Sequence, residues 1–225
     1  CCTRKTIPNY DIEVIREIIA NALVHKVYTM RGDIFINLDK QATYRELKKL
    51  GVPHISDEMT IIARQYEKGI ISTQEFTNFF SSQLGVSVSE VIVAWNSILL
   101  NFPRERFLFL KELYESKKYR LFLLSNTNEL HISWIQQNWG FNQYMEFKNC
   151  FEKFYLSHEI KLRKPNKEIY EFALKENNLI AEETLFIDDL EENTAAASTL
   201  GIHVWNLIPN QEDVSQLFIK KQYLF

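Results

Sequence analysis

The chemistry that this sequence could perform is concentrated at Asp188 and Asp189, two adjacent carboxylates. They follow Thr184–Ile187, a β-branched and apolar run typical of a strand buried on both faces of a parallel sheet. The carboxylates would then lie at the carboxyl end of the strand, where open α/β sheets hold their ligands. Two clustered carboxylates repel each other and favour a bound cation, and their oxygen atoms suit Mg²⁺. The alternative is that both aspartates only cap the following helix.

Two further polar groups lie beside predicted elements. Ser125 and Asn126 follow the apolar run Tyr119–Leu124, and Lys164 is followed by Pro165 just before a predicted helix. Taken singly, Ser125 could be a turn or cap residue and the Lys-Pro pair an ordinary loop. Taken with the acidic pair, they provide a hydroxyl, an ammonium group and a metal site, which together can hold a phosphoryl group and neutralise it during transfer.

The elements that must position these groups alternate between strands and helices from Tyr119 onward. This alternation predicts an α/β fold with a doubly wound parallel sheet. The predicted strands are Tyr119–Leu124, Phe154–Ser157, Thr184–Ile187 and Ile202–Leu207, and the predicted helices are Glu129–Trp139, Asn166–Asn177, Glu191–Leu200 and Val214–Lys221.

The first half of the chain is predicted to be mainly helical. Apolar residues recur at helical spacing over 11–24, whereas 25–38 is expected to be extended. Within the helical stretch that follows, Ser72 and Ser87 each stand three residues before a glutamate, which is capping-box spacing. The expected division is an extra N-terminal helical segment at 1–25, a helical cap at 41–102, and an α/β core formed by 26–40 and 103–225.

The composition excludes several classes of protein. The chain has 225 residues, 46% of them hydrophobic and 24% charged, with a net charge of −3, which argues against a nucleic-acid-binding surface. No apolar run approaches the roughly 20 residues that span a bilayer, and no signal peptide is evident. Cys1, Cys2 and Cys150 show neither metal spacing nor a paired framework, which suits a reducing cytoplasm. Because the chain starts without methionine, we expect a fragment.

In order and spacing, the three polar groups resemble the motifs of the haloacid dehalogenase (HAD) superfamily, specifically its phosphatase-like members with a small helical cap. Ser125-Asn126 resembles the second motif, whose hydroxyl and following amide bind phosphoryl oxygens. Lys164-Pro165 resembles the third, whose lysine steadies the nucleophile and the transferring group. Asp188-Asp189 resembles the fourth, which holds Mg²⁺. The resemblance covers about residues 34–207 and implies a Rossmannoid core that hydrolyses a small phosphorylated metabolite.

The first motif of that family departs from its usual form here. In that family the first motif is an apolar strand that ends in Phe-Asp-x-Gly-Gly-Val, and its aspartate is the nucleophile. Ile34–Asp39 resembles the tail of this motif, and counting back places Met30 at the nucleophile position. A thioether can neither attack phosphorus nor bind Mg²⁺, and Asp33 and Asp39 are too far along the chain to point into the same pocket. The resemblance therefore implies a scaffold with Mg²⁺ binding weak or lost, and we expect it to be inactive.

The N-terminal 30 residues resemble a different family. Glu17, Asn21 and His25 keep the four-residue spacing of the helix that serves water activation and Mg²⁺–ATP in GHKL-type ATPase modules of helicase-related proteins. The alternative is an amphipathic surface helix with chance polar spacing. That module also needs glycine-rich boxes, and the six glycines of this chain are scattered. The two resemblances meet near Arg31–Asp33, which suggests a chimera or a wrongly assembled reading frame.

Two readings of function follow. The first is a HAD-like hydrolase, ancestrally a Mg²⁺-dependent phosphatase, with Met30 in place of its nucleophile. The second is a non-catalytic binding or interaction protein, or a non-functional product of gene fusion. In either case the central strand of the sheet must be filled, because losing it would expose two strand edges. Residues 26–30 are therefore predicted to form a parallel strand beside both 121–124 and 185–187.

Overall fold

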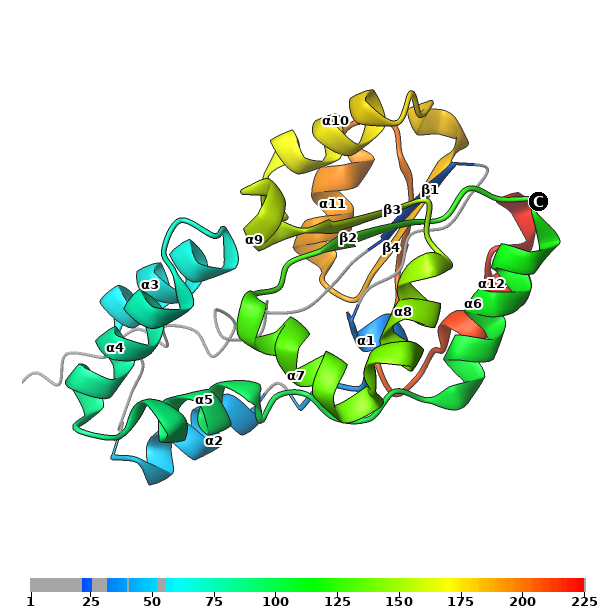
Figure 1. Cartoon of the computed structure of the whole chain (residues 1–225). Coiled ribbons are helices and arrows are strands. Elements are labelled where there is room, and N and C mark those ends of the chain that lie inside the picture. The colour runs from blue at the N-terminus through cyan, green and yellow to red at the C-terminus, as the bar shows by residue number, and fades with distance from the viewer. Residues whose placement is uncertain (1–21, 26–31, 40, 52–55, 225) are drawn as a thin grey trace, which may run out of the picture.

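The computed structural model describes residues 22–25, 32–39, 41–51 and 56–224. Its α/β core contains two parallel strand pairs, which are β2 (Phe122–Ser125) with β3 (Lys153–Leu156) and β4 (Thr184–Asp188) with β5 (His203–Asn206). The predicted α/β fold with parallel strands is confirmed, and Figure 1 shows helices on both sides of these strands. No helix of the described part is long and apolar enough to cross a membrane.

The central strands are buried because each supplies apolar side chains to two separate cores. In β2, Leu123 joins the core under helices α6 (Arg104–Ser116) and α8 (Phe141–Asn149), whereas Phe122 and Leu124 join the core under α10 (Lys167–Glu176). β4 alternates in the same way. Successive side chains of a strand point to opposite faces, so a continuous apolar run is what two covered faces require.

The N-terminal expectations are only partly testable, since residues 1–21 and 26–31 lie outside the described residues. β1 (Ala22–His25) is a strand that pairs antiparallel with β4, from Ala22 opposite Ile187 to His25 opposite Thr184. The helix predicted over 11–24 is therefore wrong at its last three residues, and His25 does not continue a helical face from Glu17 and Asn21. The edge of β4 offered backbone hydrogen bonds, which outweighed the helical spacing.

The strand expected at 26–30 also falls outside the described residues. Within the part that the structure describes, β2 and β4 are not paired with each other. β1 pairs with β4 and lies close to β2, so an antiparallel strand occupies the place for which a parallel one was predicted.

The segment expected to be extended over 25–38 contains a turn of helix, α1 (Gly32–Phe35). Phe35 is buried edge-on against the rings of Phe102, Phe147 and Phe151. Aromatic packing of this kind stabilises the turn without any strand partner. Within the same segment, His25 ends strand β1 and Leu38 forms an antiparallel bridge with Leu99.

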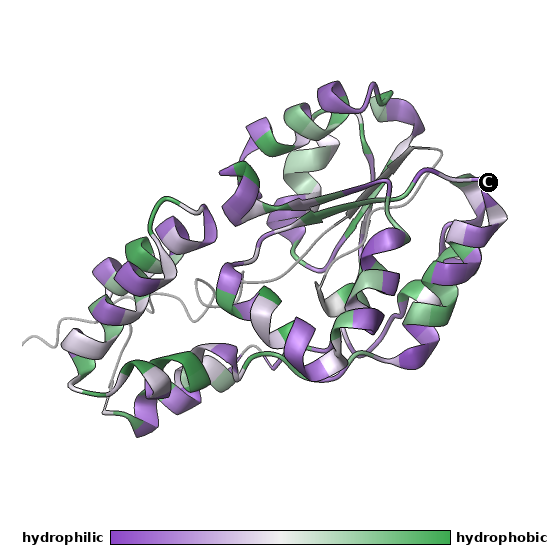
Figure 2. Ribbon diagram, viewed as in Figure 1, coloured by the Kyte–Doolittle hydropathy of each residue, from purple (hydrophilic) through white to green (hydrophobic). Residues whose placement is uncertain are grey.

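Four helices fill most of the segment between this bridge and α6. They are α2 (Ala42–Lys49), α3 (Asp57–Glu67), α4 (Thr73–Leu84) and α5 (Val88–Asn96). Both predicted capping boxes are confirmed, since Ser72 and Ser87 each accept a hydrogen bond from the amide of the glutamate three residues on. Figure 1 shows α3 and α4 set to one side of the sheet, and Figure 2 shows their mixed polar and apolar faces.

The remaining elements follow the predicted order with small changes. α7 (Glu129–Trp139) and α11 (Glu191–Ser198) follow β2 and β4. Helix α8 was not predicted, and Ser157 begins a short helix, α9 (Ser157–Ile160), rather than ending β3. The predicted terminal helix is divided into a 3-10 turn at Val214–Gln216 and α12 (Leu217–Lys220).

Candidate functional site

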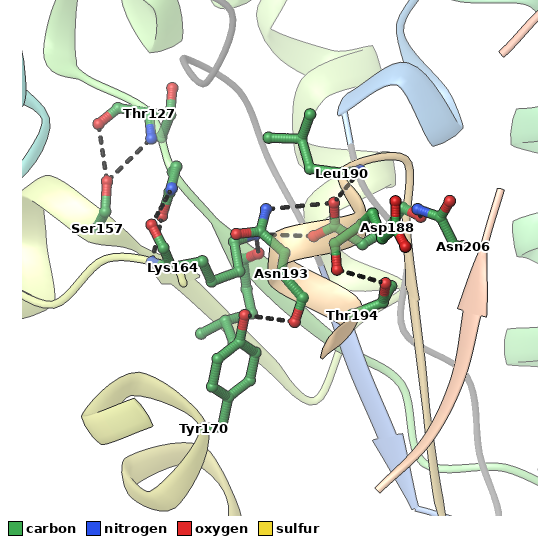
Figure 3. A network of polar contacts seen from close by, with 12 residues as sticks. Thr127, Ser157, Lys164, Tyr170, Asp188, Leu190, Asn193, Thr194 and Asn206 are labelled. Carbon is green, nitrogen blue, oxygen red and sulfur yellow. Dashed lines mark hydrogen bonds and ion pairs between the residues drawn. The ribbon is translucent and has the colours of Figure 1, made fainter. Parts of the chain in front are cut away.

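Three of the residues singled out in the sequence meet at the carboxyl ends of β2 and β4. Ser125 is the last residue of β2, Asp188 is the last of β4, and Lys164 lies in the loop between α9 and α10. Their relative exposures are 1%, 0% and 0%. Lys164 extends toward Asp188 (Figure 3), with its Nζ 3.9 Å from Asp188 Oδ2 and 2.6 Å from the carbonyl oxygen of Leu124, to which it donates.

Asp188 is fixed by two hydrogen bonds to its other oxygen. Its Oδ1 accepts from the Leu190 amide at 2.8 Å and from the Asn193 side-chain amide at 3.2 Å. The Asn193 carbonyl in turn accepts from the Tyr170 hydroxyl at 2.9 Å. These contacts join the start of α11 to α10 beneath the site (Figure 3), so the carboxylate has a defined orientation.

Asn126 holds the main chain of Lys164. Its side-chain Nδ2 donates to the Lys164 carbonyl at 3.0 Å, and its Oδ1 accepts from the Lys164 amide at 2.9 Å. The Lys164-Pro165 peptide bond is cis. The sequence predicted a phosphate-binding role for Asn126, and the structure shows its side chain bonded to the Lys164 loop instead.

Ser157 is a residue of the site region that sequence reasoning missed. Its Oγ accepts from the Thr127 amide at 2.9 Å and lies 2.7 Å from the Glu67 carbonyl oxygen and 3.0 Å from that of Thr127. It therefore ties the loop after β2 to the end of α3. No sequence signal pointed to it, because its partners are 30 and 90 residues away along the chain.

The carboxylates suit a hard cation by type. Asp188 and Asp189 are adjacent at the end of β4. Two further oxygen atoms of the region, Ser125 Oγ and Asn193 Oδ1, are buried and have no hydrogen-bond partner among the described residues. Oxygen atoms of these kinds are the ligands that Mg²⁺ takes. Among the described residues, however, no three His, Cys, Asp or Glu side chains form a group that could hold a metal. The oxygen atoms of the described residues fit Mg²⁺ in kind.

Near the first motif, the carboxylate of Asp39 is engaged with other groups. Asp39 pairs with Arg45 at 2.5 Å and accepts the Gln41 amide at 3.1 Å, ahead of α2. The hydrogen bond from Arg45 is the main reason that the pKa of Asp39 is lowered. Met30 lies outside the described residues, and so does the side chain of Asp33.

A cavity of about 440 Å³ lies between the α3–α4 turn and helices α7 and α9. Glu129, Glu159 and His158 are the ionisable groups on its wall besides the phenol of Tyr66. Burial lowers the pKa of His158, so this ring is neutral at physiological pH. The described lining of this cavity carries two carboxylates and no Lys or Arg side chain, so it does not suit a phosphate group.

Comparisons with known proteins agree with this geometry. The model of the haloacid dehalogenase-like hydrolase family matches residues 94–207. The chain is 26% identical to the D-ribitol-5-phosphate phosphatase of Bacteroides thetaiotaomicron over 181 residues, which are 77% of this chain and 87% of the relative. It is 25% identical to a sesquiterpene phosphatase of Aspergillus oryzae over 185 residues, 78% of this chain and 85% of the relative.

Solved structures show the same kinship. A HAD family enzyme of Bacteroides thetaiotaomicron, in complex with magnesium and inorganic phosphate, is 33% identical with a TM-score of 0.70, covering 83% of this chain and 95% of that one. A HAD-like hydrolase of Porphyromonas gingivalis is 29% identical with a TM-score of 0.73, covering 86% and 94%. The chain therefore belongs to the haloacid dehalogenase-like hydrolases.

Proposed function

We propose that this chain binds a small phosphate ester through Ser125, Lys164 and the Asp188–Asp189 pair, and that turnover is weakened or lost because Met30 replaces the nucleophile. The observation that carries the proposal is the position of the Lys164 ammonium. It is fully buried near the carboxyl ends of β2 and β4, where it donates to the Leu124 carbonyl and lies 3.9 Å from the Asp188 carboxylate. A buried cation next to a strand end favours an anion there, because water does not screen it.

The roles of the residues follow from their chemistry. The Ser125 hydroxyl and the main-chain amide of Asn126 would donate to phosphoryl oxygens, and Lys164 would neutralise their charge. Asp188 and Asp189 would hold Mg²⁺, which supplies further neutralisation of the phosphoryl group. Each donor is positioned by a strand end or by the Asn126–Lys164 contact, so the placement of these donors does not require an aspartate at position 30.

Binding and turnover are expected to separate in this chain. With no aspartate at position 30, Mg²⁺ loses one anionic ligand, so its affinity is weakened. An aspartate-to-alanine variant of the Bacteroides thetaiotaomicron enzyme was solved with magnesium and inorganic phosphate. That relative supports a site that still holds both species after losing an aspartate. The phosphatase relatives also support an organic phosphate monoester as the substrate class.

The second candidate is a non-catalytic binding protein or a product of gene fusion. The observation that favours it is at the first motif, where Gly32–Phe35 forms a turn of helix and β1 runs antiparallel to β4. An ATP-binding module is not supported, since the only described residue of the GHKL-like triplet, His25, is in a strand.

Calorimetry with inorganic phosphate in the presence of Mg²⁺ tests the proposal. The wild-type chain should bind phosphate, and Lys164→Ala should abolish binding, whereas the matched control Lys167→Ala should not. Lys167 is a solvent-exposed lysine of α10 that pairs with Glu171 on its own helix. Equal binding by wild type and Lys164→Ala would show that the anion site is elsewhere and would support the second candidate.

A further inference from the structure

The last turn of helix α3 docks onto the loop that carries Lys164. Arg163, the residue before Lys164, places both Nε and Nη2 3.2 Å from Glu67 Oε2. The two side chains are only 8% and 2% exposed. This ion pair therefore joins a cap helix to the α/β core in a region that water does not reach, where a charge left without its partner is strongly disfavoured.

Two main-chain contacts support the same joint. The Glu67 carbonyl oxygen accepts a hydrogen bond from the Ser157 hydroxyl, and the same hydroxyl oxygen accepts one from the Thr127 amide in the loop after β2. Gly69 lies so close to the core that a Cβ at this position would be 2.0 Å from the carbonyl oxygen of His158. The end of α3 is therefore in contact with α9, and Figure 1 shows the segment after α3 running toward α9.

A third contact comes from Tyr66, next to Glu67. Its hydroxyl accepts the Leu130 amide at 3.1 Å and lies 2.8 Å from Thr73 Oγ1, which donates to Glu129 at 2.5 Å. Burial raises the pKa of Tyr66 to about 12, so the phenol keeps its proton at any ordinary pH. The end of α3 thus contacts the loop after β2, the start of α9 and the Lys164 loop at once.

We infer that the buried Glu67–Arg163 pair is a positioning device that couples the end of cap helix α3 to the phosphate-binding lysine. Arg163 and Lys164 share a peptide bond, and the Lys164 amide is held by Asn126 Oδ1 at 2.9 Å. A shift of Glu67 would pull Arg163 and so displace the adjacent lysine. Conversely, an anion that draws Lys164 toward Ser125 would hold α3 in place. The consequence for anion binding rests on the proposed function, whereas the mechanical connection does not.

Buried ion pairs can be replaced by apolar side chains without loss of stability, so the double variant Glu67→Met/Arg163→Met separates positioning from folding. The matched control is Arg120→Met/Glu152→Met, which removes a two-bond arginine–glutamate pair whose side chains are 38% and 42% exposed. Two measurements are compared in all three proteins. They are the affinity for inorganic phosphate with Mg²⁺, and amide hydrogen exchange of residues 66–70 and of Lys164.

In the wild type and the control, phosphate should slow exchange of residues 66–70 by about tenfold, within the range typical of coupling between sites. In the Glu67→Met/Arg163→Met protein that slowing should vanish, and phosphate affinity should fall by about tenfold. An unchanged affinity together with unchanged phosphate-dependent slowing would overturn the inference and leave the pair a merely structural contact.

If the wild type binds no phosphate, the proposed function is refuted, but the connection between Glu67 and Lys164 can still be tested without ligand. In that case the Lys164 amide is compared without ligand, using the milder variant Glu67→Gln at matched global stability. Faster exchange of this amide in Glu67→Gln would support the mechanical connection. Equal exchange would contradict it, because Asn126 alone would then be holding the lysine.

Discussion

At the scale of residues, Lys164 shows how a charged side chain is held inside the core. Its ammonium donates to Leu124, its main chain is bound at both polar atoms by Asn126, and Asp188 lies 3.9 Å away. Isolated charges are not tolerated in such surroundings. The position of the lysine is therefore defined by groups from two segments, residues 124–126 and the end of β4.

Asn126→Leu should lower the affinity for inorganic phosphate and destabilise the protein. The substitution keeps the volume but leaves the Lys164 amide and carbonyl without their buried partners, which costs about 1–3 kcal/mol per group. The control is Asn138→Leu on the exposed side of α7, where the side chain bonds only the carbonyl of its own helix. Urea denaturation of both variants gives the comparison, and equal stabilities would show that the Asn126 contact contributes nothing net.

Met30→Asp should gain Mg²⁺-dependent hydrolysis of an aryl phosphate, whereas the wild type should show none. The new carboxylate supplies both a nucleophile and a further metal ligand. Gly32 offers no general acid two residues on, so esters with good leaving groups should respond most. Met30→Asn is the control of the same shape without the charge. Equal activity in wild type and Met30→Asp, lost from both with Lys164→Ala, would place the nucleophile elsewhere.

At the scale of elements, the joint between α3 and α9 depends on a glycine. Gly69 has φ +61° and Gly85 has φ +65°, so both end their helices in the left-handed region that favours glycine. Only Gly69 is crowded, since a Cβ there would meet the His158 carbonyl, whereas nothing lies within 4 Å of the Cβ position at Gly85. Substituting alanine at Gly85 therefore measures the cost of backbone strain alone, whereas alanine at Gly69 adds the cost of disturbing the contact between α3 and α9.

Gly85→Ala should destabilise the chain by about 1 kcal/mol, which is the typical cost of a non-glycine residue in this conformation. Gly69→Ala should cost several times as much, because α3 must move away from α9 to admit the methyl group. Chemical denaturation measures both free energies of unfolding. Similar values for the two variants would mean that α3 adjusts to the methyl group without loss.

At the scale of the whole molecule, buried acids set the response to alkaline pH. Cys150 is packed in the larger core, and burial raises the pKa of its thiol to about 11 from an ordinary value of 9.0. A group whose folded-state pKa is raised binds its proton more tightly in the folded than in the unfolded chain. The stability it contributes is present below pH 9 and decreases as the pH rises toward 11.

Thermal unfolding should therefore show a decrease of stability between about pH 9 and pH 11, and Cys150→Ala should reduce that decrease. The same burial should keep this thiol unreactive toward a disulfide reagent at pH 8 until the protein unfolds. The labelling test requires a Cys1→Ser/Cys2→Ser background, in which Cys150 is the remaining cysteine. Rapid labelling of that folded protein would contradict the burial of Cys150.

The sequence alone determined the four strands between residues 119 and 207, both capping boxes and the family, since each rests on local spacing. A buried strand requires a continuous apolar run, and a capping box requires serine three residues before glutamate, so neither depends on distant residues. The same local reasoning located Ser125, Lys164 and Asp188 at the ends or loops of the elements that bring them together.

Only the tertiary structure decided which side chains hold these residues. The Asn126–Lys164, Ser157–Glu67 and Glu67–Arg163 contacts join residues 38, 90 and 96 positions apart, and no spacing rule reaches over such distances. The same reason explains the errors near the N-terminus. Residues 22–24 have helical spacing, yet they form β1 because the edge of β4 offers backbone partners. Phe35 lies in the helical turn α1 because its ring packs against three other aromatic rings. Where a segment's main stabilising partners are distant in sequence, its conformation is set by them and not by its own pattern.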